Sequence, residues 1–301
     1  MRERRRINRE RRPRLASGGV LMNTTLISST LPLSTVGLEK MVQDGLNRLV
    51  SETDSFRQSA LYQSYLDSMA AFWPYSFRNQ MLIRLQCPIS SRVAGFRAWN
   101  DLGRRILPGS KGIKILAPYT RKTVRLDVST GEENEVDFTA FFPVTVFDVS
   151  QTSGKELPRL DIDLSGNSHE WMVSRLTAFC ESHHIRLETK NIGVNGLYGY
   201  SQGGTIVLSA NQPPNMTVNT LVHEIAHELL HHSLEGKNFS KAEQEIQAEG
   251  TAYVVCQALE LQTKSPQYLA TYTKETSQIM EQLSVISKTA KRILLFIQEK
   301  D

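Results

Sequence analysis

The sequence HEIAH at residues 223–227 has the residue types of a catalytic metal site. His223 and His227 are four positions apart, so on a helix they project from one face and can ligate a single zinc ion. Glu224 lies beside them and could act as the general base that takes a proton from a water molecule at the metal. Apolar residues recur around the motif at helical spacing and predict a helix over residues 218–232.

A catalytic zinc ion needs a third protein ligand and an open position. The predicted helix over residues 240–261 offers Glu245 and Glu249, which share a face because they are four positions apart. Either could ligate the metal, and the other could hydrogen-bond a ligating histidine. His231 extends the histidine row, but its place at a helix C-terminus favours an interaction with the helix dipole over a fourth ligand. We expect one Zn²⁺ per chain, with another divalent metal such as Mn²⁺ as the alternative.

A second kind of chemistry is indicated by the uneven distribution of charge. The formal net charge of the 301 residues is only +4, yet residues 73–125 hold eleven basic groups against one acidic group, and residues 126–301 are acidic overall. Basic groups follow phosphates and aromatic rings stack on unpaired bases, so this segment predicts single-stranded DNA binding. The alternative is that the aromatic residues are core and the charges a solvated face. The candidate contacts are Trp73, Tyr75, Arg78, Arg84, Arg92, Arg97, Trp99, Arg104, Arg105, Lys111 and Lys114.

Composition excludes several classes of protein. An apolar content of 40% and a charged content of 22% are ordinary for a globular chain, which excludes a wholly disordered chain, a fibrous repeat and a small disulfide scaffold. No apolar run approaches the ~20 residues needed to span a bilayer, so no membrane partner is expected. Three isolated cysteines favour a reducing compartment, and no apolar core follows the first arginines, so we expect a cytoplasmic protein.

The length favours two domains. We predict a disordered basic tail over residues 1–22, a DNA-binding domain over 23–160 and a metal-binding domain over 161–301, divided by a Ser-, Gly-, Pro- and Asp-rich linker. The periodicity gives an α+β fold class. Helices are expected at 36–72, 76–85, 168–183, 218–232, 240–261 and 266–300, and strands at 113–116, 123–128, 138–149, 185–189 and 205–209.

Two sets of motifs resemble a known family. The sequences WPYSFRNQMLIRLQCP at 73–88, RVAGFRAW at 92–99 and GSKGIKILAP at 109–118 resemble the N-terminal domain of ArdC-type antirestriction proteins. Residues 223–227 and 245–256 resemble the zincin-like metallopeptidase domain that follows it in that family and is akin to the ImmA/IrrE peptidases. The resemblance covers most of the chain from about residue 38 onward and does not include the basic tail.

The resemblance implies an α+β domain that binds single-stranded DNA, followed by a mainly helical gluzincin-like metallopeptidase domain with a small antiparallel sheet. It adds Asn79 to the DNA-binding candidates, and it favours Glu245 over Glu249 as the third ligand because Glu245 precedes Ala248 by three positions. Arg78 departs from the polar amide of many relatives.

The implied function is protection of incoming DNA from restriction, by a protein of a plasmid or other mobile element, during conjugation. Its partners would be single-stranded DNA and an unknown protein substrate or restriction-system component. The alternatives are a regulatory metallopeptidase that cleaves a repressor-type protein, and a DNA-binding shield whose metal site is not catalytic.

Overall fold

The structure is a computed structural model that describes residues 34–52, 55–126, 133–157, 170–193, 196–232, 239–261, 263 and 276–299. Helices and small sheets make up these residues, so the predicted α+β class is confirmed. The predicted basic tail and the predicted domain boundary near residue 160 lie outside the described residues. Within them, no helix is both long enough and apolar enough to cross a bilayer.

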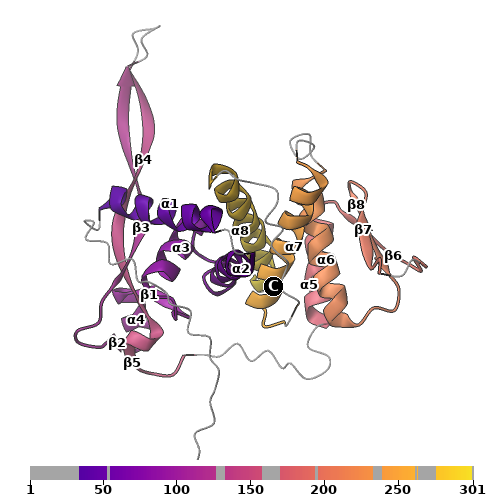
Figure 1. Cartoon of the computed structure of the whole chain (residues 1–301), viewed down its shortest axis with the longest axis horizontal. Coiled ribbons are helices and arrows are strands. Elements are labelled where there is room, and N and C mark those ends of the chain that lie inside the picture. Colours follow the sequence, from indigo (N-terminus) through magenta and orange to yellow (C-terminus); the bar gives the residue numbers. More distant parts are fainter. Residues whose placement is uncertain are drawn as a thin grey trace, which may run out of the picture.

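The N-terminal half combines three helices with a long two-stranded ribbon. Its elements are α1 (Thr35–Ser51), α2 (Ser55–Ala71), α3 (Phe77–Gln86), β1 (Val93–Gly95), α4 (Phe96–Asp101), β2 (Arg104–Ile106), β3 (Ile113–Leu126), β4 (Glu133–Asp148), a 3-10 turn (Val149–Gln151) and β5 (Thr152–Gly154). Strand β4 lies between β1 and β3, and the outer part of the β3–β4 ribbon extends away from the helices (Figure 1). The strands predicted separately at 113–116 and 123–128 are thus one continuous strand.

Two buried amides fix α3 against the ribbon. The Asn79 side chain donates to the Leu116 carbonyl at 2.8 Å and accepts from the Leu116 N–H at 2.9 Å. The Gln86 side chain repeats this two-way pairing with the backbone of Lys114, at 2.7 and 2.9 Å. Each amide therefore replaces a neighbouring strand along this edge of β3, where backbone groups would otherwise be buried without partners.

The C-terminal half is mainly helical. Its elements are α5 (Glu170–Ser182), β6 (Arg186–Lys190), β7 (Gly199–Ser201), β8 (Thr205–Ser209), α6 (Pro214–Leu230), α7 (Lys241–Ala258) and α8 (Thr276–Gln298). The small sheet has the order β6-β8-β7, with β8 parallel to β6 and antiparallel to β7. The expected antiparallel sheet is therefore corrected to a mixed one, because residues 191–198 return the chain to the far side of β8.

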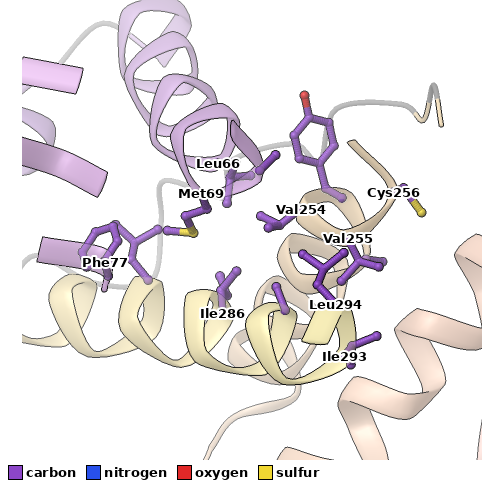
Figure 2. Close-up of a cluster of buried hydrophobic side chains, with 14 of the residues drawn as sticks. Leu66, Met69, Phe77, Val254, Val255, Cys256, Ile286, Ile293 and Leu294 are labelled. Atoms are coloured by element: carbon purple, nitrogen blue, oxygen red, sulfur yellow. The ribbon is translucent and has the colours of Figure 1, made fainter. Parts of the chain in front are cut away.

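Helix α8 packs between the two halves of the chain (Figure 1). Figure 2 shows Ile286 and Leu294 of α8 among side chains of α2, α3 and α7. Polar contacts join the same elements. Ser287 Oγ donates to Gln80 Oε1 at 3.0 Å, and Tyr253 Oη of α7 donates to Asp67 Oδ1 of α2 at 2.8 Å. One continuous core therefore holds α7, which carries Glu245, against the N-terminal helices.

Replacing Asn79 with alanine would leave the Leu116 backbone groups buried without partners. We expect Asn79→Ala to lower the free energy of unfolding by about 1–3 kcal/mol, measured by urea denaturation. The neighbouring Arg78 is exposed, so Arg78→Ala should change stability by no more than about 0.5 kcal/mol. Equal losses in the two variants would contradict the bracing role of Asn79.

Candidate metal centre

Helix α6 directs the histidine row of the metal motif toward α7. The helix begins at Pro214, four residues earlier than predicted, and a proline fits its first turn because the N–H there has no helical partner. One face of α6 is completely buried and consists of Val218, Leu221, Val222, Ile225 and Ala226. Burial of this apolar face fixes the rotation of the helix, and therefore the direction in which His223 and His227 project.

Helix α7 brings Glu245 to these histidines. Its N-terminus is closed by a capping box in which Ser240 and Glu243 bond each other's backbone N–H groups. Small buried residues follow, Ala248, Gly250 and Ala252 among them, and let the helix approach its neighbours closely. Because α6 and α7 pack directly together, a carboxylate distant in sequence lies beside the HEIAH motif.

Three donor atoms converge at this contact. The Nε2 atoms of His223 and His227 are 3.0 Å apart, and the carboxylate oxygens of Glu245 lie 3.5 Å from His223 Nε2 and 3.6 Å from His227 Nε2. Tetrahedral zinc with bonds of 2.0–2.2 Å separates its ligands by about 3.3–3.5 Å. The donor spacing and the nitrogen–oxygen donor set therefore fit one divalent metal ion.

The carboxylate that completes this set is Glu245. Glu249, the alternative ligand, lies one turn further along α7 and is exposed, and its carboxylate is not part of the converging group. The Glu245 side chain is itself 53% exposed, whereas that of His227 is 13% exposed. The site is therefore buried on the α6 side and open to solvent on the α7 side, as a site that receives a substrate requires.

Charge compensation among these groups is strong. Contacts with His223 and His227 hold the pKa of Glu245 well below its usual range, against the effect of burial. Burial alone would lower the pKa of His223, but its contact with Glu245 and the charges of Glu224 and Glu249 outweigh burial and raise it. The three ligand residues thus form a mutually stabilised cluster without any ion.

Glu224 differs from Glu245 in its environment. Its side chain is 7% exposed, and burial raises its pKa although the nearby imidazoles oppose the shift. A carboxyl with a raised pKa exchanges protons closer to neutral pH than an exposed one does. Glu224 is therefore suited to accept and return a proton beside the metal ligands.

A second layer of polar contacts surrounds the histidines. His231 caps the C-terminus of α6, and its Nδ1 lies 2.9 Å from His227 Nδ1. Its Nε2 lies 3.0 Å from Oε1 of Gln247, a completely buried side chain of α7. Burial lowers the pKa of His231, against the hydrogen bond to Gln247. Sequence reasoning missed Gln247, although a glutamine two positions after a candidate ligand on a helix of small residues was a usable signal.

Helix α6 is also tied to the small sheet. The Glu228 carboxylate accepts hydrogen bonds from the N–H groups of Gly203 and Gly204, at 3.0 and 2.7 Å. Both glycines have positive φ, 79° and 83°, a conformation that glycine adopts without strain. The turn between β7 and β8 is therefore anchored one residue beyond His227, which places edge strand β7 next to the metal helix.

The candidate DNA contacts divide into two groups. Five of the predicted cations have exposed side chains, and four of them lie on the segment that carries β1, α4 and β2, seen at one end of the molecule in Figure 1. The exposed cations are Arg78, Arg92, Arg97, Arg105 and Lys111. Trp73 is half-buried and, with Arg92, lines a cavity of about 410 Å³ where α2 meets the end of α7.

The other candidates are engaged in holding the fold. Trp99 is only 2% exposed and its Nε1 donates to the Phe147 carbonyl, so it is not available for stacking on a base. The side-chain amide of Asn79 is fully used by Leu116, as described above. The remaining engaged side chains bond protein groups: Tyr75 to Val93, Arg84 to Ser68 and Pro88, Arg104 to Thr152 and Lys155, and Lys114 to Thr145.

The sequence prediction also missed an aromatic face on the ribbon. The register pairs Arg121 with Phe138, Tyr119 with Ala140 and Ala117 with Phe142, so these side chains share one face. Tyr119, Phe138 and Phe142 are exposed, and the Tyr119 and Phe142 rings are 6.4 Å apart. Alternation along the predicted strand 138–149 was the signal available in the sequence.

The fold and the site together define a two-domain protein that joins an α+β domain to a helical domain with a zincin-like HEIAH motif. Comparison with known families matches residues 42–147 to the N-terminal domain of anti-restriction factor ArdC and residues 180–294 to the IrrE N-terminal-like domain of the M78 peptidases. The chain therefore belongs to the ArdC-type proteins, with both domains in the order that the motifs predict.

Individual relatives are distant. The chain is 26% identical over 277 residues to an uncharacterized protein of Bacillus anthracis, a match that covers 77% of this chain and 46% of that protein. The chain thus spans about half the length of that curated relative. The metal-free crystal structure of the antirestriction ArdC protein from plasmid R388 aligns over 86% of this chain and 97% of its own, with 17% identity and a TM-score of 0.49. Its Mn(II)-bound structure aligns over 80% and 99%, with 18% identity and a TM-score of 0.45.

The two candidate carboxylates can be separated by substitution. Because only Glu245 lies with the histidine nitrogens, we expect Glu245→Gln to weaken Zn²⁺ binding by more than about 100-fold, beyond the effect of losing an outer contact. The matched variant Glu249→Gln should remain within a few-fold of the unmodified protein. Metal content after dialysis and competition with a chelating dye measure both. The reverse ranking would make Glu249 the ligand.

Proposed function

We propose that this protein is a divalent-metal-dependent peptidase that also binds single-stranded DNA and protects incoming DNA from restriction. The observation that carries the proposal is the convergence of His223, His227 and Glu245 at metal-ligand spacing, beside the buried Glu224. The ArdC-type domain order supports the antirestriction role, because both halves that such a role would use are present in one chain.

The mechanism assigns distinct work to the chain's own residues. A divalent metal held by His223, His227 and Glu245 would polarise a peptide carbonyl and make a water molecule more acidic. Zn²⁺ fits the donor set, and Mn²⁺ is the other candidate, because the plasmid R388 protein has an Mn(II)-bound structure. Glu224 accepts the proton of the attacking water and returns it to the leaving amine, a pair of transfers for which its raised pKa is suited.

A protein substrate is supported by the position of the small sheet. Strand β7 pairs with β8 alone among the described strands and packs against α6. An extended peptide could add to its outer edge through backbone hydrogen bonds, which accept many side-chain sequences. The glycine turn held by Glu228 would keep this edge at a fixed distance from the metal ligands.

Single-stranded DNA binding is supported by the exposed cations of the N-terminal half. Arg92, Arg97, Arg105 and Lys111 lie within twenty residues of one another, on elements that pack together. Closely spaced cations follow a phosphate backbone, and they need no base sequence to do so. The aromatic contacts would come from Trp73 and the Tyr119, Phe138 and Phe142 face of the ribbon, in place of the buried Trp99.

The peptidase half of the proposal is tested by Glu224→Gln. This variant keeps the three ligands, so it should retain metal binding while hydrolysis of casein or a co-expressed partner falls by about 10²–10⁴-fold, the usual contribution of a general base. Protection of conjugatively transferred DNA should be measured in the same variant. Loss of both activities ties protection to catalysis, whereas full protection by a metal-bound, inactive variant would favour a DNA-binding shield.

The DNA half is tested by removing two exposed cations together. We expect the double variant Arg97→Ala, Arg105→Ala to bind a single-stranded oligonucleotide more weakly and to flatten its salt dependence by about 1.4 in the log–log slope, or about 0.7 for each phosphate contact. Fluorescence anisotropy at several salt concentrations measures this. The matched control Arg186→Ala, Lys288→Ala removes two exposed cations from the C-terminal half. The same loss in the control would remove the case for a defined DNA-binding segment.

A further inference from the structure

His227 has two ring nitrogens with different surroundings. Its Nε2 faces His223 Nε2 and the Glu245 carboxylate, as described above. Its Nδ1 faces His231 Nδ1 at 2.9 Å, and His231 Nε2 in turn faces Gln247 Oε1 at 3.0 Å. Two imidazoles and an amide thus form a continuous chain that leads from the proposed metal position into the buried contact between α6 and α7.

The position of each proton in this chain follows from hydrogen-bond chemistry. A histidine that ligates a metal through Nε2 must present a lone pair there, so its proton is on Nδ1. The acceptor within reach of that proton is His231 Nδ1, which must therefore also carry a lone pair. The proton of His231 is then on Nε2, where the carbonyl oxygen of Gln247 accepts it.

We propose that His231 and Gln247 are positioning residues that hold His227 in the tautomer able to bind metal. The inference rests on the metal site proposed above and assigns a function to two side chains that no ligand set includes. His231 contacts the metal ligand but not the metal, because both of its ring nitrogens are already engaged. Its position at the end of α6 makes the chain of contacts short and buried.

The orientation of the Gln247 amide is the step that makes this arrangement selective. Turning the amide over would place its NH₂ group against His231 Nε2, reverse each donor and acceptor in the chain, and put the His227 proton on the metal-facing nitrogen. The observed orientation leaves Gln247 Nε2 buried without a hydrogen-bond partner. Such a group costs stability, and polar groups of this kind are retained where they serve a site.

Gln247 also links the ligand sets of the two helices. It lies two residues after Glu245 on α7, so the same helix supplies both the carboxylate and the acceptor that orients His227. A shift of α7 along α6 would displace both contacts together. The tautomer of His227 is therefore coupled to the helix packing that completes the metal site.

The test compares three variants of one residue type on α7. Gln247→Leu removes the acceptor in a similar volume, and Gln247→Glu keeps an oxygen toward His231. Gln257→Leu is the matched control, since Gln257 lies on the same helix but lines the cavity beside α2. Zn²⁺ is titrated into the metal-free full-length protein against a chelating dye, and thermal unfolding of each metal-free variant confirms the fold.

We expect Gln247→Leu to weaken Zn²⁺ binding by about 10–100-fold, the usual effect of losing a contact to a ligating histidine. Gln247→Glu and Gln257→Leu should bind as the unmodified protein does, or more tightly in the case of Gln247→Glu. A folded Gln247→Leu protein with unchanged Zn²⁺ affinity would overturn the proposal. Weakening by Gln257→Leu to the same degree would also overturn it, because the effect would then be one of helix packing.

A spectroscopic measurement keeps the proposal independent of folding and of the metal site itself. Nitrogen-15 chemical shifts of the histidine rings in the metal-free protein above pH 7.5, near neutral, report which nitrogen carries each proton. We expect protons on His227 Nδ1 and His231 Nε2, so the proton between the two facing Nε2 atoms would belong to His223. A proton on His227 Nε2 would overturn the relay. Failure of the unmodified protein to bind any divalent metal would instead overturn the proposed function.

Discussion

The contact between α6 and α7 is the constraint on which the site depends. Helix α6 alone supplies two imidazoles in a row, which offer nitrogen ligands but no negative charge to balance a cation. Helix α7 brings the Glu245 carboxylate within 3.6 Å of both imidazoles, and this approach requires small residues at the helix surface. The same contact buries Gln247 and His231, so ligand spacing and ligand orientation have one physical origin.

That contact is supported from the other side of α7. Tyr253 reaches α2 through Asp67, and Figure 2 shows Val254 and Val255 beside residues of α2 and α8. The N-terminal helices therefore act as a support for the metal helix as well as carriers of the candidate DNA contacts. The cavity lined by Trp73 and Arg92 lies at this junction, next to the end of α7 that is opposite Glu245. The two proposed activities thus share one helix.

Sequence predicted the parts of the site that local periodicity determines. His223, Glu224 and His227 follow from spacing on one helix, and the pair Glu245 and Glu249 follows in the same way from the next. The choice between those two carboxylates depends on how α7 rotates against α6, which a long-range contact sets. The role of Gln247 depends on the same contact, so no pattern within α7 could reveal it.

The candidate DNA contacts show the complementary failure. An aromatic or basic residue in a charged segment can face solvent or the core, and composition does not distinguish the two. Trp99 was assigned to the surface, but the carbonyl of Phe147, 48 residues away, accepts its N–H in the core. Asn79 and Arg104 are occupied by backbone groups that are equally distant in sequence. The exposed aromatic face of the ribbon depends on cross-strand register, which joins Tyr119 and Phe142 only after the hairpin has formed.

The charge distribution explains how one chain can present both surfaces. At physiological salt an exposed charge acts over about 8 Å, so the basic segment and the acidic C-terminal half influence their surroundings separately. The net charge of +4 is therefore a poor guide to what either surface attracts. Phosphates are drawn to the exposed cations around β1, α4 and β2, whereas the carboxylates around the metal ligands repel them. A strand held by the N-terminal half would leave the metal centre free for a protein, which carries no such density of negative charge.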